Sequence, residues 1–267
     1  MARVGGSRQG KTPTINEEKD KEEKAMKQAA AFFDIDGTIY REGLITEVFK
    51  KMVTHEIIDQ KRWHDEVKPA YMAWDRRVGD YDTYLMRMTE IFKQTLVGFS
   101  SQHINFIAQK VIEQKGDRVY QFTRQEIERH QREGRKVIAI SGSPDALVRL
   151  MAEKYRFDDW RGSLYRTDEH GYYTGEIVPM WDSVSKLKAL NELVEEYNLD
   201  LDECWAYGDT NGDFTMLKAV GHPTAINPTR ELLLNIRADA ELAKKIRVVV
   251  ERKDVVYNID LKTLKLE

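Results

Sequence analysis

Residues 29–38 read AAAFFDIDGT, and this stretch decides the fold that the rest of the chain supports. It starts as an apolar run and ends in two carboxylates, Asp34 and Asp36, followed by Gly37. A strand that is buried in a parallel sheet shows such an uninterrupted apolar run, and turn residues bound it. We therefore expect a central parallel strand that presents Asp34 and Asp36 at its carboxyl end.

The second half of the chain alternates between strands and helices. The run from Val137 to Ile140 is apolar, rich in β-branched residues, and ends at Ser141-Gly142. Further strands are expected at 203–207 and 223–226, a hairpin at 162–177, and helices from residue 144, over 183–197 and from residue 214. Strands and helices that alternate through short links predict an α/β fold, a three-layer doubly wound parallel sheet.

A helical block interrupts this alternation. From about residue 44 to residue 130, apolar residues keep helical spacing, with breaks at Gly79-Asp80 and Val97-Gly98. We expect residues 44–130 to form a helical bundle that is inserted as a cap. Residues 29–43 and 131–267 then form the α/β core.

The first 28 residues contain glycines and the charged run NEEKDKEEK, so they have no face to bury. We interpret residues 1–28 as a disordered or vector-derived leader. Residues 5–12 also match the pattern of a phosphate-binding P-loop. A P-loop needs a preceding strand and a following helix, whereas here only four residues precede the match and Pro13 follows it. We interpret the match as chance.

Composition narrows the class of protein. The 267 residues exceed what one core usually needs, and 41% hydrophobic with 33% charged residues suit a packed, globular chain. A net charge of -3 provides no basic surface for nucleic acid. Cys204 is the single cysteine, so an internal disulfide is excluded, and we expect this thiol to be inert packing. Without a membrane-length apolar run or a signal-peptide pattern, we expect a cytoplasmic protein that has no membrane partner.

Polar residues follow three of the expected strands, at 34–38, 141–143 and 208–213. In open parallel sheets, ligands bind outside the carboxyl ends of the strands, so the fold gathers these segments at one edge. They supply carboxylates, hydroxyl groups and backbone amides. This combination suits a hard cation and a phosphate bound together.

These motifs resemble those of the haloacid dehalogenase superfamily. Phe33 to Thr38 is similar to its first motif, Ser141 to the second, Lys186 to the third, and Asp209 with Asp213 to the fourth. The order and spacing match from Phe32 to Ile226, and the helical block resembles the cap of the phosphoserine-phosphatase-like branch, subfamily IB. The resemblance implies a Rossmann-type core, Mg²⁺, and a phosphatase that acts on a small phosphorylated metabolite.

The resemblance also implies catalytic roles. Asp34 is the nucleophile that forms an aspartyl-phosphate, and Asp36 first donates a proton to the leaving oxygen and then takes one from water. The metal ligands are the carboxylates of Asp34 and Asp209 and the backbone carbonyl of Asp36. Asp213 holds a ligating water or Lys186 from behind the metal.

The phosphoryl group of the substrate needs contacts of its own. Ser141 donates its hydroxyl, and the amides near Gly142 and the following helix start add donors. Lys186 neutralises charge on Asp34 and on the phosphoryl group. Thr38 completes the expected phosphoryl contacts.

Each residue also has an ordinary structural interpretation. Asp36-Gly37 is a common turn pair, and Ser141 could cap the following helix. Asp209 and Asp213 could be turn and cap residues, and Lys188 competes with Lys186. Four motifs in the family order favour the catalytic interpretation, and Lys186 fits the family position directly before Leu187.

The cap departs from the phosphoserine phosphatase pattern. The cap glutamate of those enzymes falls on Gly43, one residue after Glu42, and their cap arginine falls near Glu90. The departure leaves phosphoserine unsupported as the substrate. The candidate substrate contacts in the cap are Glu42, Arg87, Arg76 and Arg77.

Several functional classes remain open. A hydrolase of small phosphomonoesters comes first, as a monomer or homodimer that binds neither nucleic acid nor membrane. A phosphotransferase or mutase would use the same residues with an alcohol in place of water. A non-catalytic binding protein on this fold and a nucleotide switch built on residues 5–12 are the other classes.

Overall fold

The computed structural model describes residues 27–265, and within them eight strands form one sheet. The strand order is β4-β3-β2-β1-β5-β6-β7-β8; the two outer pairs are antiparallel and the remaining pairs are parallel. The strands are β1 (Ala30–Phe33), β2 (Lys136–Pro144), β3 (Asp159–Thr167), β4 (Tyr173–Val178), β5 (Trp205–Gly208), β6 (His222–Ile226), β7 (Arg247–Arg252) and β8 (Val255–Ile259). The predicted α/β fold class is confirmed.

Strand β1 lies at the centre of the sheet and is completely buried. Its last residue, Phe33, pairs in parallel with Ala139 of β2 on one side and with Tyr207 of β5 on the other. Because the three strands run in the same direction, their carboxyl ends meet at one edge. The register thus sets the segments after Phe33, after Ile140 and after Tyr207 side by side.

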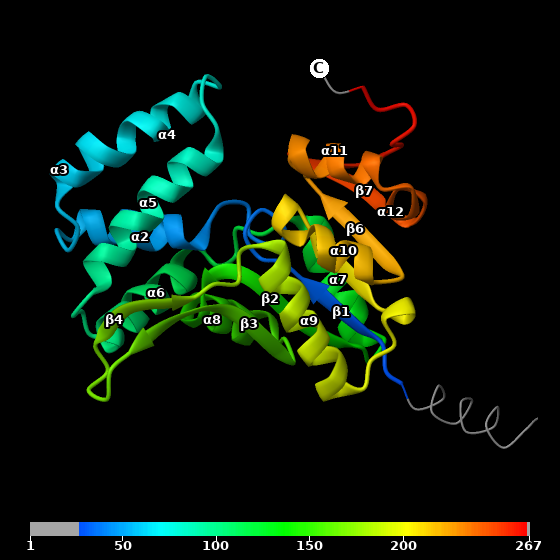
Figure 1. Cartoon of the computed structure of the whole chain (residues 1–267), viewed down its shortest axis with the longest axis horizontal. Coiled ribbons are helices and arrows are strands. Elements are labelled where there is room, and N and C mark those ends of the chain that lie inside the picture. Colours follow the sequence, from blue (N-terminus) through cyan, green and yellow to red (C-terminus); the bar gives the residue numbers. More distant parts are fainter. Residues whose placement is uncertain (1–26, 266–267) are drawn as a thin grey trace, which may run out of the picture.

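Side chains of β1 alternate between two hydrophobic cores, as the two-residue period of a strand requires. Ala31 and Phe33 join the core on the side of α7 (Gln121–Arg132) and α8 (Asp145–Tyr155). Ala30 and Phe32 join the opposite core, under α9, α10, α11 and α12. These helices span Ser183–Tyr197, Phe214–Ala219, Arg230–Ala238 and Ala240–Lys245. Figure 1 shows α9 and α10 on one face of the sheet and α7 and α8 on the other, which makes three layers.

The segment between β1 and β2 contains the predicted helical block. Its helices are α2 (Leu44–Thr54), α3 (Gln60–Arg62), the π-helix η1 (Trp63–Val67), α4 (Lys68–Asp75), α5 (Tyr81–Leu96), α6 (Ser101–Lys115) and α7. In Figure 1, α2 to α5 form a lobe at the upper left, above β3 and β4. Helix α6 packs against α2 and α8, whereas α7, within the expected cap segment, packs on β1 and β2.

Aromatic rings hold the α4–α5 pair together. Trp74 and Tyr84 are stacked at 5.8 Å between ring centroids, Trp74 lies 5.2 Å from Tyr81, and Tyr71 lies 5.4 Å from Tyr84. We call Tyr71, Trp74, Tyr81 and Tyr84 the ring cluster. Aromatic pairs at such distances add about 0.5–1.5 kcal/mol each beyond their buried area, so these rings have fixed places in the cap.

Two expectations concern segments at the ends of the chain. The P-loop-like residues 5–12, and all but two residues of the expected leader, lie outside the described residues. Among residues 27–265, no helix is both long enough and apolar enough to cross a lipid bilayer.

Candidate active site

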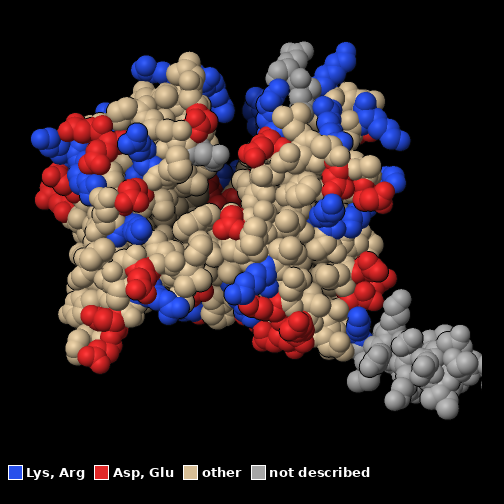
Figure 2. Space-filling model, in the orientation of Figure 1, with Lys and Arg blue, Asp and Glu red and all other residues tan. Residues whose placement is uncertain are grey.

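The predicted site residues lie at the carboxyl edge of β1, β2 and β5, below the cap. Figure 2 shows a cleft between the lobe of α2–α5 and the lobe that contains α10 and α11, with acidic side chains at its floor. The buried polar residues of this edge are Asp34, Thr38, Ser141, Ser143, Lys186, Asp209 and Asp213. Buried polar groups require partners, and the contacts described below supply them.

Lys186 bridges two carboxylates. Its Nζ atom lies 2.7 Å from Oδ1 of Asp34 and 2.5 Å from Oδ1 of Asp213, and only 3% of the residue is exposed. Helix α9 begins three residues earlier, where the Asp182 side chain caps the amides of Val184 and Ser185. The first turn of α9 therefore directs Lys186 to the tip of β1.

Lys188, the other lysine considered for this role, points away from the site. The Lys188 side chain is 79% exposed and lies 3.9 Å from Glu192 on the outer face of α9. Two residues along a helix turn the side chain by about 200°, so Lys186 and Lys188 cannot both face the sheet.

Asp213 organises the loop after β5. Its Oδ2 atom accepts hydrogen bonds from the amides of Asp209 and Thr210, at 3.0 and 3.1 Å, while its Oδ1 contacts Lys186. A Cβ atom on Gly208 would lie 2.4 Å from the Cβ of Asp213, so this close approach requires glycine. Asp213 thereby fixes the position of Asp209.

Asp209 meets the turn that follows β1. Its Oδ1 atom accepts a hydrogen bond from Thr38 Oγ1 at 3.1 Å. Gly37 has φ +82°, and a Cβ atom there would lie 2.0 Å from Asp209 Oδ2. Both the backbone angle and the missing side chain are needed to bring the two loops into contact.

Asp36 connects the core to the cap. Its Oδ1 atom accepts from the amide of Leu44 at 2.7 Å, and its Oδ2 atom accepts from Ser143 Oγ at 2.5 Å. Leu44 is the first residue of α2, so the first cap helix starts on this carboxylate. The sequence reasoning did not select Ser143, although the segment Ser141-Gly142-Ser143 was expected at this edge; the amide of Ser143 also donates to Ser141 Oγ at 3.2 Å.

The electrostatics of the site are dominated by buried acids. Burial raises the pKa of Asp34 to about 8, and the charges of Asp213 and Asp36 add to the rise, against the effect of Lys186. Burial, followed by the charges of Asp34 and Asp213, raises the pKa of Asp209 well above its ordinary value. Burial disfavours the charged form of Lys186, but Asp213 and Asp34 outweigh it and raise the lysine pKa. One cation thus faces three carboxylates.

The three carboxylates offer oxygen atoms that all lie within 4.8 Å of one another, from Asp34, Asp209 and Asp213. Hard divalent cations take oxygen ligands of this kind, and a bound cation would balance the excess negative charge. The residues present therefore fit a divalent cation. Asp213 already uses both oxygens for protein contacts, so Asp34 and Asp209 are the stronger ligands of the set.

The charged cap candidates lie apart from this centre. Glu42 Oε1 is 2.9 Å from Arg118 Nη2, and a little under half of each side chain is exposed. Arg87, Arg76 and Arg77 are also exposed. The structure does not bring these four side chains into the cluster around Asp34.

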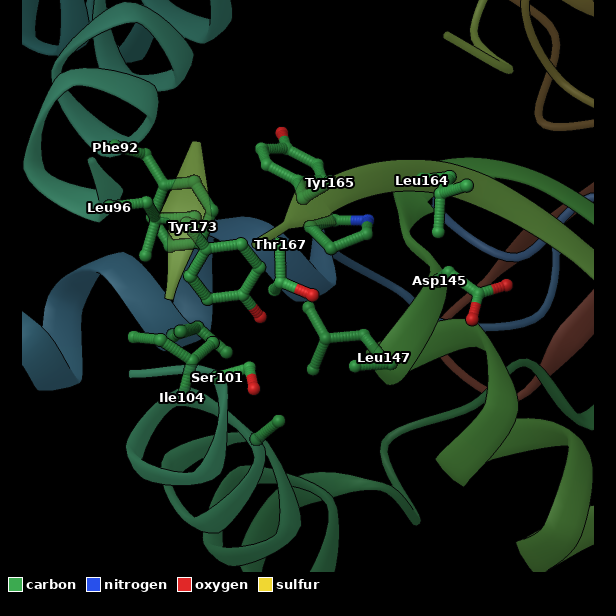
Figure 3. A pocket seen from close by; sticks show the side chains of 14 residues that line it. Phe92, Leu96, Ser101, Ile104, Asp145, Leu147, Leu164, Tyr165, Thr167 and Tyr173 are labelled. Atoms are coloured by element: carbon green, nitrogen blue, oxygen red, sulfur yellow. The ribbon is translucent and has the colours of Figure 1, made fainter. Parts of the chain in front are cut away.

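A cavity of about 170 Å³ lies between the cap and the β3–β4 hairpin. Figure 3 shows the side chains of Phe92, Leu96, Tyr165, Tyr173 and Leu147 around it, with the Ser101 and Thr167 hydroxyls among them. Pro144, which follows Ser143, also lines it. Mostly apolar walls make this a pocket of the cap–core junction rather than a second ionic site.

Comparisons with known proteins agree with this arrangement. The family model of haloacid dehalogenase-like hydrolases matches residues 31–218. An inhibition of morphological differentiation protein of Streptomyces azureus is 27% identical over 213 residues, which cover 79% of this chain and 76% of that protein. A probable phosphatase of Mycobacterium tuberculosis is 25% identical over 207 residues, which cover 77% and 71%.

A solved structure shares the fold. The substrate-bound complex of a phosphoserine phosphatase aligns with a TM-score of 0.56 and 18% sequence identity, over 85% of this chain and 95% of that one. The family match covers the carboxyl ends of β1, β2 and β5 and also helix α9, which carries Lys186. The chain therefore belongs to the haloacid dehalogenase-like hydrolases, as an enzyme of that family with a phosphoserine-phosphatase-like fold.

Proposed function

We propose that the protein is a Mg²⁺-dependent phosphomonoester hydrolase that forms an aspartyl-phosphate on Asp34. The observation that carries the proposal is the placement of Asp34, at the tip of the central strand, paired with Lys186 and within ligand distance of Asp209. A carboxylate nucleophile divides one difficult displacement into two easier steps. The substrate is a small phosphorylated metabolite.

In the first step, an Asp34 oxygen attacks phosphorus and the bond from phosphorus to the leaving oxygen breaks. Asp36 donates its proton to that oxygen, so an alcohol departs. In the second step Asp36 takes a proton from water, the water oxygen attacks phosphorus, and the bond to Asp34 breaks. Burial raises the pKa of Asp36, which favours the protonated form that the first step requires.

The remaining residues hold charge and position. Mg²⁺, when bound by the carboxylates of Asp34 and Asp209 and the carbonyl of Asp36, would neutralise negative charge on the phosphoryl group. Lys186 provides a fixed positive charge, while Ser141, Thr38 and the amides from Gly142 onward hold the phosphoryl oxygens. Positioning and charge neutralisation supply most of the acceleration in phosphoryl transfer.

The experiment is hydrolysis of p-nitrophenyl phosphate by the purified protein with Mg²⁺, with EDTA, and with the Asp34→Asn variant. Of these three conditions, only the wild type with Mg²⁺ should show turnover. Asp254→Asn, at an exposed position in the β7–β8 turn, is the matched control and should retain turnover. Turnover by a folded Asp34→Asn protein would overturn the mechanism, and an added acceptor alcohol separates hydrolysis from phosphotransfer.

A further inference from the structure

The cap contributes uncharged hydroxyl groups at the point where it meets the catalytic acid. Gly43 immediately precedes α2 and the amide that binds Asp36. A Cβ atom on Gly43 would lie 3.1 Å from Thr46 Oγ1 and 3.3 Å from the Tyr81 hydroxyl. Because glycine adds no side chain here, both oxygens remain close to the loop that carries Asp36.

Tyr81 faces the acidic centre. The residue is half-buried, and burial is the main cause of its raised pKa. The negative charges of Asp36 and Asp209 raise this pKa further. The Tyr81 hydroxyl, which lies close to Gly43, is therefore next to the loop whose Leu44 amide binds Asp36.

The ring cluster fixes this hydroxyl. Tyr81 packs 5.2 Å from Trp74 and 5.9 Å from Tyr84, so its ring has partners on α4 and α5. A hydroxyl on a ring held in this way loses little conformational entropy when it binds a ligand. It is better placed to recognise a substrate than a long exposed side chain such as Arg87.

Thr46 adds a second hydroxyl. The residue is 5% exposed, and its Oγ1 atom interacts with the neighbouring hydroxyls of Tyr81 and Tyr84, although no well-aligned hydrogen bond satisfies it among residues 27–265. A buried hydroxyl without such a bond is costly, and a ligand hydroxyl could provide the missing bond. The charged neighbour Glu42 is already paired with Arg118.

We propose, on the basis of the phosphatase function above, that Tyr81 and Thr46 bind a hydroxyl group of the leaving alcohol. The substrates are then phosphorylated polyols or sugars rather than phosphorylated amino acids. Recognition of an amino acid would need charged partners for its ammonium and carboxylate groups, and this part of the cap presents neutral oxygens instead.

The test compares kcat and KM for glycerol 3-phosphate, ribose 5-phosphate, phosphoserine and p-nitrophenyl phosphate. The wild type should prefer at least one of the first two over phosphoserine by tenfold or more in kcat/KM. For the preferred polyol or sugar phosphate, we take the ratio of its kcat/KM to the kcat/KM of p-nitrophenyl phosphate. Tyr81→Phe should lower this ratio about tenfold, chiefly through a higher KM, because the variant loses one hydrogen bond to the substrate.

Two further variants make the result specific. Thr46→Val should lower the same ratio. This variant tests the inference on its own if Tyr81→Phe does not fold. Tyr71→Phe removes a hydroxyl from the same ring cluster and should leave the ratio within twofold. A preference for phosphoserine, or an unchanged ratio in both Tyr81→Phe and Thr46→Val, would overturn the inference while hydrolysis of p-nitrophenyl phosphate still upholds the phosphatase. Absence of all hydrolysis would overturn both.

Discussion

The Oγ atom of Ser143 lies 2.5 Å from Oδ2 of Asp36, although 107 residues separate them in the chain. This bond joins the end of β2 to the group that is proposed to move protons. The backbone amide of Leu44 donates a hydrogen bond to the other oxygen, Oδ1, of the same carboxylate. Both contacts favour the ionised form of Asp36 and oppose the effect of its burial.

Ser143→Ala should therefore raise the pKa of Asp36 further. Hydrolysis of the aspartyl-phosphate requires ionised Asp36, so the acid limb of the kcat–pH profile should move to higher pH. Steady-state rates between pH 4.5 and 9 measure the shift. Thr54→Ala, which removes an exposed hydroxyl on α2, is the control and should leave the profile in place. An acid limb that stays unmoved in Ser143→Ala would mean that this bond does not tune the proton-transfer group.

Lys186→Met should abolish activity, with a loss of at least about a hundredfold in kcat, because preorganised charge contributes on this scale. It also leaves Asp34 and Asp213 buried without their cation, so the protein should unfold at a lower temperature. Lys188→Met changes an exposed lysine on the same helix and should retain both activity and Tm. Equal effects of the two substitutions would contradict the assignment of Lys186.

The metal-free protein should lose stability as pH rises. Folding raises the pKa of Asp34 from 3.8 to about 8, so the folded state binds more protons than the unfolded state between these values. The contribution of this group is therefore fully present below about pH 4 and is lost as pH rises through 8. Mg²⁺ should reverse the loss, because it favours the ionised carboxylates.

Thermal unfolding at pH 5 and pH 8, each with EDTA or with Mg²⁺, measures this coupling. We expect Mg²⁺ to increase Tm more at pH 8 than at pH 5, since protons compete with the metal at low pH. In the Asp34→Asn variant, the increase in Tm caused by Mg²⁺ should differ less between pH 8 and pH 5. A Mg²⁺ effect on Tm that is the same at both pH values would argue against a metal site on buried, titrating carboxylates.

Gly37→Ala should remove activity and destabilise the protein by more than the roughly 1 kcal/mol that a left-handed backbone angle costs a residue with a side chain. The added methyl group would collide with Asp209. Gly98→Ala is a matched control, because Gly98 has φ +73° and open space around it. Urea unfolding and p-nitrophenyl phosphate hydrolysis measure the two variants. Similar losses in both would show that the backbone angle, rather than contact with Asp209, decides the result.

The buried strand that ends at Asp34 was predictable because its signal is local. An apolar run of about five residues that ends in a carboxylate and a glycine turn is typical of a buried parallel strand. The polar ends of the expected strands at 137–140 and 203–207 followed from the same pattern. The outer strands β7 and β8 were not predicted. Helix α7 lies within the expected cap segment, but it packs on the sheet. The sequence could not show this, because an apolar helix face does not indicate which surface it covers.

The sequence by itself determined the α/β core, the inserted helices and the residues at the strand tips, since apolar periodicity and turn residues act over short stretches of chain. Only the tertiary structure decided which oxygens and cations meet. It placed Ser143 on Asp36, brought the Tyr81 hydroxyl next to Gly43, and left Glu42 and Arg87 away from the cluster around Asp34. Such contacts depend on helix phase and on how the cap sits over the sheet, which spacing along the chain does not encode.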